Sequence, residues 1–217
     1  MIWDYLQNDP RWANHPYSAP GGTMADSGCG PTAIADVVGV LPPEVGDYMT
    51  AAGYAAPYGQ GTYWSGIIPS CEHFGHSGIQ MNGNNLYGQR GSETEKRWIA
   101  AMQSGKYYGI LLMGKGYFTQ GGHFIAIEEV SENAAKCYDP AWSVRSGWHP
   151  WYDFYQGCVE VFYLVEKKQG ELYIWILNKF TKAAPEPAFW SVRNSLPVVV
   201  FIRAVSMVQP GRRPERQ

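Results

Sequence analysis

The sequence lacks any long uninterrupted run of apolar residues. Its most apolar stretch, residues 196–208, is broken by Pro197 and Arg203 and falls short of the roughly 18–20 residues that cross a bilayer. The first residues also lack the basic start and long apolar run of a secretory signal peptide. We therefore expect a soluble protein without stable membrane insertion. Both the cytoplasm and an exported environment stay open.

Cysteine is scarce and scattered. Four are present, none in CxxC spacing: Cys29, Cys71, Cys137 and Cys158. This arrangement gives little support to a disulfide framework in a chain of 217 residues. Soft metal ligands lie close together at Cys71, His73 and His76, but a structural zinc site takes about four ligands and no second cluster accompanies them. We expect no metal and no cofactor.

The chain has no general excess of basic residues. Residues 1–165 carry eight Lys/Arg and fifteen Asp/Glu, a net charge of −7, whereas residues 166–217 carry nine and four, a net charge of +5. An acidic body repels phosphates, so we expect no nucleic-acid partner. The basic extension has the charge to contact an acidic partner, although solvated terminal extensions of this kind are common.

Apolar patterning predicts helices first and strands afterwards. Expected helices cover about 31–38, 42–53, 63–74, 96–103 and 148–156, and expected strands cover 107–113, 123–130, 135–140 and 158–164. This order is the α+β layout. We expect one main domain over residues 1–165. The extension 166–217 has no assigned role, with a helix near 171–177, a strand near 198–202 and a disordered end at 209–217.

A cysteine lies where a loop is expected to become a helix. Gly28 and Gly30 flank Cys29 and allow tight turns and the approach of a substrate carbonyl, and Pro31 suits the first helical position. Unpaired amides and the positive dipole end of a helix favour a thiolate. Free cysteines are more often buried and structural, yet this setting favours Cys29 as a nucleophile.

A thiolate nucleophile needs a base and a group that orients the base. His123 opens an apolar strand after two glycines, and Asp139 ends the next strand of an expected hairpin. Antiparallel pairing brings the end of one strand beside the start of its neighbour. We therefore expect Asp139 to accept a hydrogen bond from His123, although Asp139-Pro140 is also a common turn start. Gln7 is a candidate donor to an oxyanion, beside the Cys29 amide.

Four segments in order carry a family resemblance: Tyr5–Trp12, Gly28–Ala33, Gly121–Ile127 and Tyr138–Pro140. Over about residues 4–165, the chain resembles papain-like cysteine peptidases of the bacteriocin-processing type, family thirty-nine, and their stand-alone bacterial relatives. The resemblance implies a papain-like fold, in which an N-terminal helical part places the nucleophile helix against an antiparallel sheet. It also implies roles for four residues: Cys29 as nucleophile, His123 as base, Asp139 as orienting residue and Gln7 in the oxyanion hole.

These observations favour a cysteine peptidase that hydrolyses a peptide or isopeptide bond of a peptide or protein substrate through a thioester acyl-enzyme. An amidase or acyltransferase acting on a cell-wall peptide or a thioester is an alternative on the same residues. A peptide-binding module without turnover is a third possibility. Two aromatic-rich stretches, 54–64 and 142–155, are candidates for lining a substrate groove, with core packing as the simpler explanation.

Overall fold

The structure is a computed structural model that describes residues 2–81, 91–156, 159–168 and 170. The chain divides into two units, Met1–Ala183 and Ala184–Gln217, and every described residue belongs to the first. The expected helix at 171–177, strand at 198–202 and disordered end at 209–217 lie outside the described residues. The division into a domain of residues 1–165 and an extension of 166–217 therefore stays a prediction.

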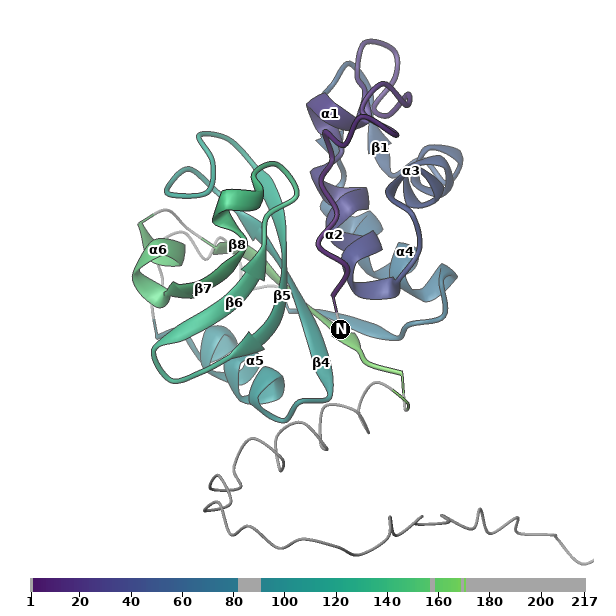
Figure 1. The fold of residues 1–217 in the computed structure, drawn as a ribbon. Coiled ribbons are helices and arrows are strands. Elements are labelled where there is room, and N and C mark those ends of the chain that lie inside the picture. The colour runs from purple at the N-terminus through teal and green to yellow at the C-terminus, as the bar shows by residue number, and fades with distance from the viewer. Residues whose placement is uncertain (1, 82–90, 157–158, 169, 171–217) are drawn as a thin grey trace, which may run out of the picture. The chain divides into compact units, whose positions relative to one another are not determined.

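The first part of the chain is helical. Its elements are α1 (Met24–Ser27), α2 (Cys29–Val38), α3 (Pro42–Ala51), a small sheet of β1 (Ala55–Ala56) and β2 (Gly61–Thr62), the 3-10 helix η1 (Trp64–Gly66) and α4 (Ile67–His73). These helices gather on one side of the molecule (Figure 1). α2 ends at Gly39, whose φ of 79° is left-handed and therefore suits glycine.

The second part is an antiparallel sheet of six strands in the order β3-β8-β4-β5-β6-β7. Its strands are β3 (Gly78–Met81), β4 (Tyr107–Met113), β5 (His123–Val130), β6 (Ala134–Tyr138), β7 (Gly147–Pro150) and β8 (Val159–Glu166). Three helices accompany them: α5 (Glu93–Gln103), η2 (Ser143–Arg145) and α6 (Trp151–Tyr155). The expected α+β layout, with the helix that begins at Cys29 packed on an antiparallel sheet, is confirmed.

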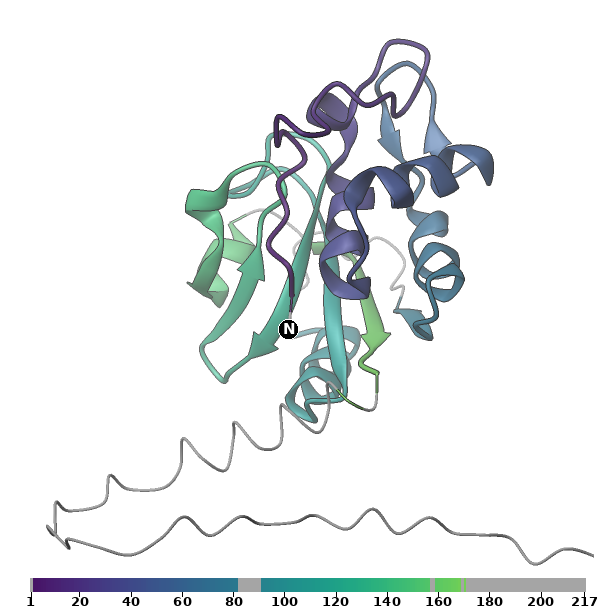
Figure 2. The same ribbon diagram turned by 45° about the vertical axis from the view of Figure 1, so that its right-hand side comes forward.

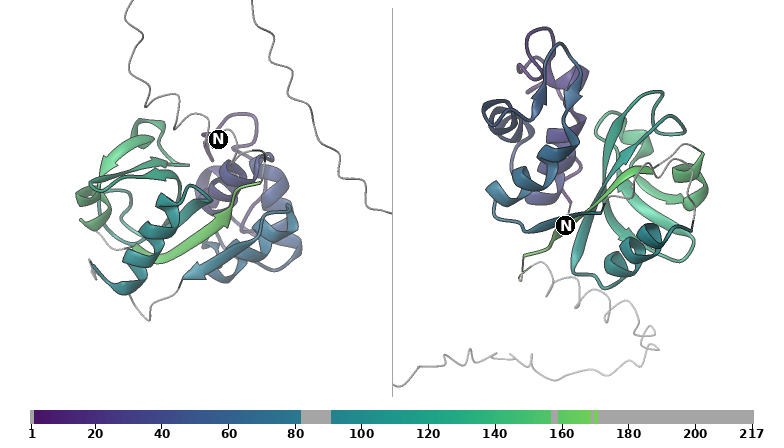
Figure 3. Two further views of the ribbon diagram at one scale, coloured as in Figure 1. Left: turned by 90° about the horizontal axis from the view of Figure 1, so that it is seen from below. Right: turned by 180° about the vertical axis from the view of Figure 1, so that it is seen from behind.

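Two hydrophobic cores cover the two faces of the sheet. Successive side chains of a strand point to opposite faces, so Ile110 joins the core that contains α2, while its neighbour Leu111 joins the core that contains Trp98 of α5. α2 packs on β5 and β4, and α5 packs on the same strands from the other side (Figures 1 and 3). Burial on both faces explains why β4, β5 and β8 are almost continuously apolar.

The N-terminal segment runs along α2 between this helix and the sheet (Figure 2). The backbone N–H of Trp3 donates to the carbonyl of Asp36 at 3.3 Å, and that of Tyr5 donates to the Asp36 carboxylate at 2.7 Å. Further on, the N–H of Gln7 donates to the carbonyl of Pro140 at 2.7 Å. The segment is thus tied to the helical part and to the loop that follows β6.

Some expected elements need correction. The stretch 148–156 is not one helix, because residues 147–150 pair with β6 as the edge strand β7 and the helix begins only at Trp151. The open edge of β6 offers hydrogen-bond partners to this backbone, so the first three residues of the stretch, 148–150, form a strand instead of a helix. The sheet also contains β3, which the sequence analysis did not identify. It is a short strand that, within the described residues, pairs only with β8.

No helix within the described part of the chain is both long enough and apolar enough to traverse a membrane.

Candidate active site

Cys29 is the first residue of α2. The helix begins two residues earlier than expected, so Pro31 occupies its third position. Proline is tolerated there because the first four N–H groups of a helix have no partner within it. Cys29 is half-buried, and the backbone N–H of Phe124, at the start of β5, is among the groups that lower the pKa of its thiol.

His123 and Asp139 meet at the ends of the β5–β6 hairpin, as expected. Ala126 pairs with Tyr138, which places the first residue of β5 close to the residue that follows β6. Nε2 of His123 lies 2.8 Å from Oδ1 of Asp139. The two side chains are 6 % and 0 % exposed, so bulk water does not compete for this hydrogen bond.

The side chains of Cys29 and His123 interact, and each shifts the pKa of the other. Burial raises the pKa of the Cys29 thiol, but the interaction with His123 and its charge outweigh burial, so that the pKa falls below its usual value. Burial likewise lowers the pKa of His123, and the partners Asp139 and Cys29 outweigh it and raise the pKa to about 10. This geometry favours a thiolate–imidazolium pair.

Gln7 is hydrogen-bonded to the helix that precedes Cys29 and to the loop that follows Asp139. Its side-chain Nε2 donates to the carbonyl of Ala25 in α1 at 2.6 Å, and its backbone N–H donates to Pro140, next to Asp139. The side chain is 7 % exposed. Since an amide NH₂ has two donors, one N–H of Gln7 is anchored and a second is available.

The two glycines beside Cys29 also have a packing role, which the sequence analysis did not identify. A Cβ on Gly28 would collide with the carbonyl oxygen of Met24 in α1, and a Cβ on Gly30 would collide with the side chain of Thr62 in β2. Close approach of these neighbours to the start of α2 therefore requires glycine at both positions.

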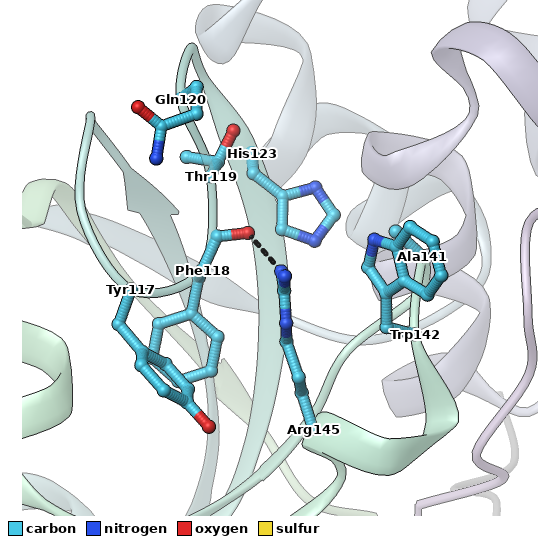
Figure 4. Close-up of a pocket in the computed structure, with 8 residues that line it drawn as sticks. All are labelled: Tyr117, Phe118, Thr119, Gln120, His123, Ala141, Trp142 and Arg145. Atoms are coloured by element: carbon cyan, nitrogen blue, oxygen red, sulfur yellow. Dashed lines mark hydrogen bonds between the residues drawn. The ribbon is translucent and has the colours of Figure 1, made fainter.

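A pocket of about 280 Å³ adjoins His123 (Figure 4). It is lined by the loop before β5, by His123 and by the loop after β6: Tyr117, Phe118, Thr119, Gln120, His123, Ala141, Trp142 and Arg145. Trp142 belongs to one of the aromatic-rich stretches expected to line a groove. The sequence analysis did not single out Arg145, because a lone arginine in a loop carries no recognisable pattern.

Several solved structures resemble this one, among them three peptidases. The peptidase domain of Streptococcus ComA, a bifunctional ABC transporter, is 16 % identical, with a TM-score of 0.48 over 69 % of this chain and 96 % of its own. A double-glycine-motif protease from an AMS/PCAT transporter, solved with its leader peptide, is 14 % identical, with a TM-score of 0.42 over 64 % and 84 %. A protein described as a C39-like peptidase from Bacillus anthracis is 11 % identical, with a TM-score of 0.49 over 77 % and 98 %.

All three neighbours are described as peptidases or proteases, and the third as C39-like. No protein-family model matches the sequence, and no curated protein matches it either. Identities of this size are too low to transfer residue roles, so the roles must be argued from this chain.

The candidate metal ligands have other surroundings. Cys71 is buried in the core, the ring of His73 stacks on Tyr48 with centroids 3.8 Å apart, and His76 Nδ1 lies 3.0 Å from the carbonyl of Glu166. Among the residues that the structure describes, no group of three or more His, Cys, Asp or Glu is arranged to hold a metal ion.

Proposed function

We propose that the chain is a cysteine peptidase that hydrolyses a peptide or isopeptide bond of a peptide or protein substrate. One observation carries the proposal: His123 lowers the pKa of the half-buried thiol at the start of α2, and the same imidazole is hydrogen-bonded to a fully buried carboxylate. A nucleophile, a base and an orienting acid in this order form the arrangement that activates a nucleophile for acyl transfer.

The proposed reaction begins when the Cys29 thiolate attacks the carbonyl carbon. The carbonyl oxygen becomes an oxyanion, to which the Cys29 amide and the second N–H of Gln7 donate. When the C–N bond breaks, the His123 imidazolium gives its proton to the leaving amine and a thioester remains. Neutral His123 then takes a proton from water, whose oxygen attacks the thioester, and the acid product leaves with the thiolate restored.

A thiol-alkylation experiment tests the ion pair. The protein is treated with iodoacetamide at neutral pH, and the rate at each cysteine is followed by mass spectrometry. We expect Cys29 to react first, because burial raises the pKa of Cys71 and of Cys137 while that of Cys29 is lowered. His123→Ala should slow Cys29 and leave the others unchanged. Equal slow labelling of all cysteines contradicts the proposal.

Turnover is tested with a synthetic peptide mixture. Products that the wild type forms and Cys29→Ala does not form define the activity, and Cys71→Ser, altered at a core thiol on α4, is the matched control. Adding a primary amine to the same reaction distinguishes hydrolysis from acyl transfer, since a transferase gives an amide product. Reactive Cys29 without any cleavage would identify a binding module instead of a peptidase.

A further inference from the structure

Two of the proposed catalytic residues, Cys29 and Gln7, do not line the pocket beside His123. Its lining includes the His123 imidazole but neither Cys29 nor Gln7 (Figure 4). In the proposed reaction, the acyl part of the substrate becomes bonded to Cys29 and its oxygen faces Gln7, whereas the leaving amine receives its proton from His123. A pocket that borders only His123 therefore lies on the leaving-group side of the scissile bond.

The guanidinium of Arg145 supplies the charge of this pocket. In Figure 4 it extends between Phe118 and Trp142 toward His123, and its Nη1 donates to the carbonyl of Phe118 at 2.6 Å. The rings of Trp142 and Tyr117 lie 5.7 and 5.9 Å from it. Within the described residues, the bond to the Phe118 carbonyl is the one hydrogen bond of the Arg145 side chain, which is 30 % exposed. Most of its five N–H donors are thus available to a ligand.

Among the described residues, no carboxylate lines the pocket beside Arg145, whose ion pair with Asp139 lies behind the lining. None of the eight residues that line it, all of them within the described ranges, is Asp or Glu. Asp139 lies 3.8 Å from the guanidinium, but its carboxylate is fully buried and shares its charge with His123. Since residues 1–165 carry a net charge of −7, an acidic substrate is repelled elsewhere on this part of the chain and needs a specific cation.

We propose that this pocket binds a carboxylate on the residue that supplies the leaving amine, with Arg145 as its partner and the rings of Tyr117 and Trp142 against its hydrocarbon part. The inference rests on the proposed peptidase function and names its substrate class. The guanidinium fork matches a carboxylate through two parallel hydrogen bonds. The carboxylate belongs either to an Asp or Glu side chain after the scissile bond or to the C-terminus of the substrate.

Two forms of one synthetic peptide mixture separate these sources, the first with free C-termini and the second amidated. A side-chain carboxylate predicts internal cleavage before Asp or Glu, preferred over Asn or Gln by roughly 10-fold or more, in both forms. A terminal carboxylate predicts release of single C-terminal residues from the free-acid form alone. In either case Arg145→Gln should lose the preference and Arg145→Lys should keep part of it.

A second variant changes a different residue of the pocket lining. Gln120 is exposed, and Gln120→Glu adds a carboxylate of the same shape to the lining, which should also reduce the preference. Thermal unfolding and the iodoacetamide rate at Cys29 show whether each variant is folded with its ion pair intact.

The possible failures are distinguishable. Absence of any Cys29-dependent cleavage overturns the proposed function itself. Cys29-dependent cleavage without a carboxylate preference, or with a preference that both Arg145→Gln and Gln120→Glu retain, overturns the inference and leaves the peptidase standing.

Discussion

Oδ1 of Asp139 accepts a hydrogen bond from Nε2 of His123 at 2.8 Å, and the same oxygen accepts the backbone N–H of Ala141 at 2.8 Å. The N–H of Trp142 reaches it at 3.3 Å. The loop after β6 therefore holds the carboxylate in place independently of the imidazole. A fixed acceptor on one ring nitrogen decides which nitrogen faces Cys29, and so couples this loop to the thiol.

We expect Asp139→Asn to narrow the pH range of peptidase activity. The pKa of His123 is raised to about 10 because Asp139 and Cys29 outweigh burial. Without the carboxylate of Asp139, the pKa of His123 falls. The imidazolium then loses its proton at a lower pH, and the ion pair with Cys29 is lost at that lower pH. The upper limb of peptidase activity, measured from about pH 5 to 11, should move to lower pH, because turnover needs the imidazolium to protonate the leaving amine. Peptidase activity should fall roughly 100-fold or more, as expected for loss of an orienting acid.

Asp153→Asn is the matched control for this measurement. Asp153 accepts a hydrogen bond from His149 Nδ1 at 2.9 Å, a carboxylate–histidine pair that does not contact Cys29. Its loss should leave the pH profile of peptidase activity unchanged. An upper limb that stays in place in Asp139→Asn would show that Asp139 does not hold the proton on His123.

Gln7→Ala tests the oxyanion donor. We expect kcat to fall by about 100- to 1,000-fold, because the lost N–H acts on charge that develops in the transition state. The iodoacetamide rate at Cys29 should change little, since alkylation forms no oxyanion. Gln103→Ala, at the exposed end of α5, controls for loss of a glutamine elsewhere. A parallel loss of alkylation and turnover in Gln7→Ala would instead indicate that Gln7 only holds the N-terminal segment in place.

The part of the site that could be predicted from sequence is the part that local patterns encode. Alternation and turn residues predict the β5–β6 hairpin, and the hairpin by itself brings His123 to Asp139. The meeting of Cys29 with His123 needs α2 to pack on β5, which no local pattern specifies. For that step the sequence analysis depended on a family resemblance.

Other features were missed because they depend on distant neighbours. β3 is short and half-exposed, and it forms a strand only because β8 offers it an open edge. The glycines beside Cys29 were assigned to substrate approach, while their neighbours, Met24 and Thr62, were not predictable from the sequence. The position of Arg145 in a pocket could not be predicted from the sequence, because the pocket forms only where three segments of the chain meet.

Gly109→Ala should lower the free energy of unfolding by about 1–3 kcal/mol, the usual cost of overpacking, here in the core that contains Trp98. A Cβ on this β4 residue would collide with the ring of Trp98 and come within 3.1 Å of Ile127. Trp98→Phe, with a smaller ring, should recover part of that loss in the double variant. Thermal unfolding of both single variants and the double variant measures the coupling. Strictly additive losses would contradict the predicted contact.

Asp36 leads to a prediction about stability against pH. It is fully buried in α2, and burial raises the pKa of its carboxyl well above the usual value, although the Tyr5 N–H acts the other way. Within the described residues its Oδ2 has no hydrogen-bond partner. A carboxyl group with a raised folded pKa contributes most stability below its unfolded pKa of about 4 and loses that contribution as the pH rises.

Asp36→Asn should therefore become the more stable protein as the pH rises. Asparagine stays neutral and keeps an oxygen that accepts the Tyr5 N–H, which Asp36 Oδ1 accepts at 2.7 Å. The difference in Tm between variant and wild type should increase from pH 4 toward neutrality by a few degrees, since about 1 kcal/mol moves Tm by 2–4 °C in a chain of this size. Glu132→Gln, at an exposed turn residue, should show no such trend. A difference that is constant with pH would mean that Asp36 is ionised in the folded protein at no cost.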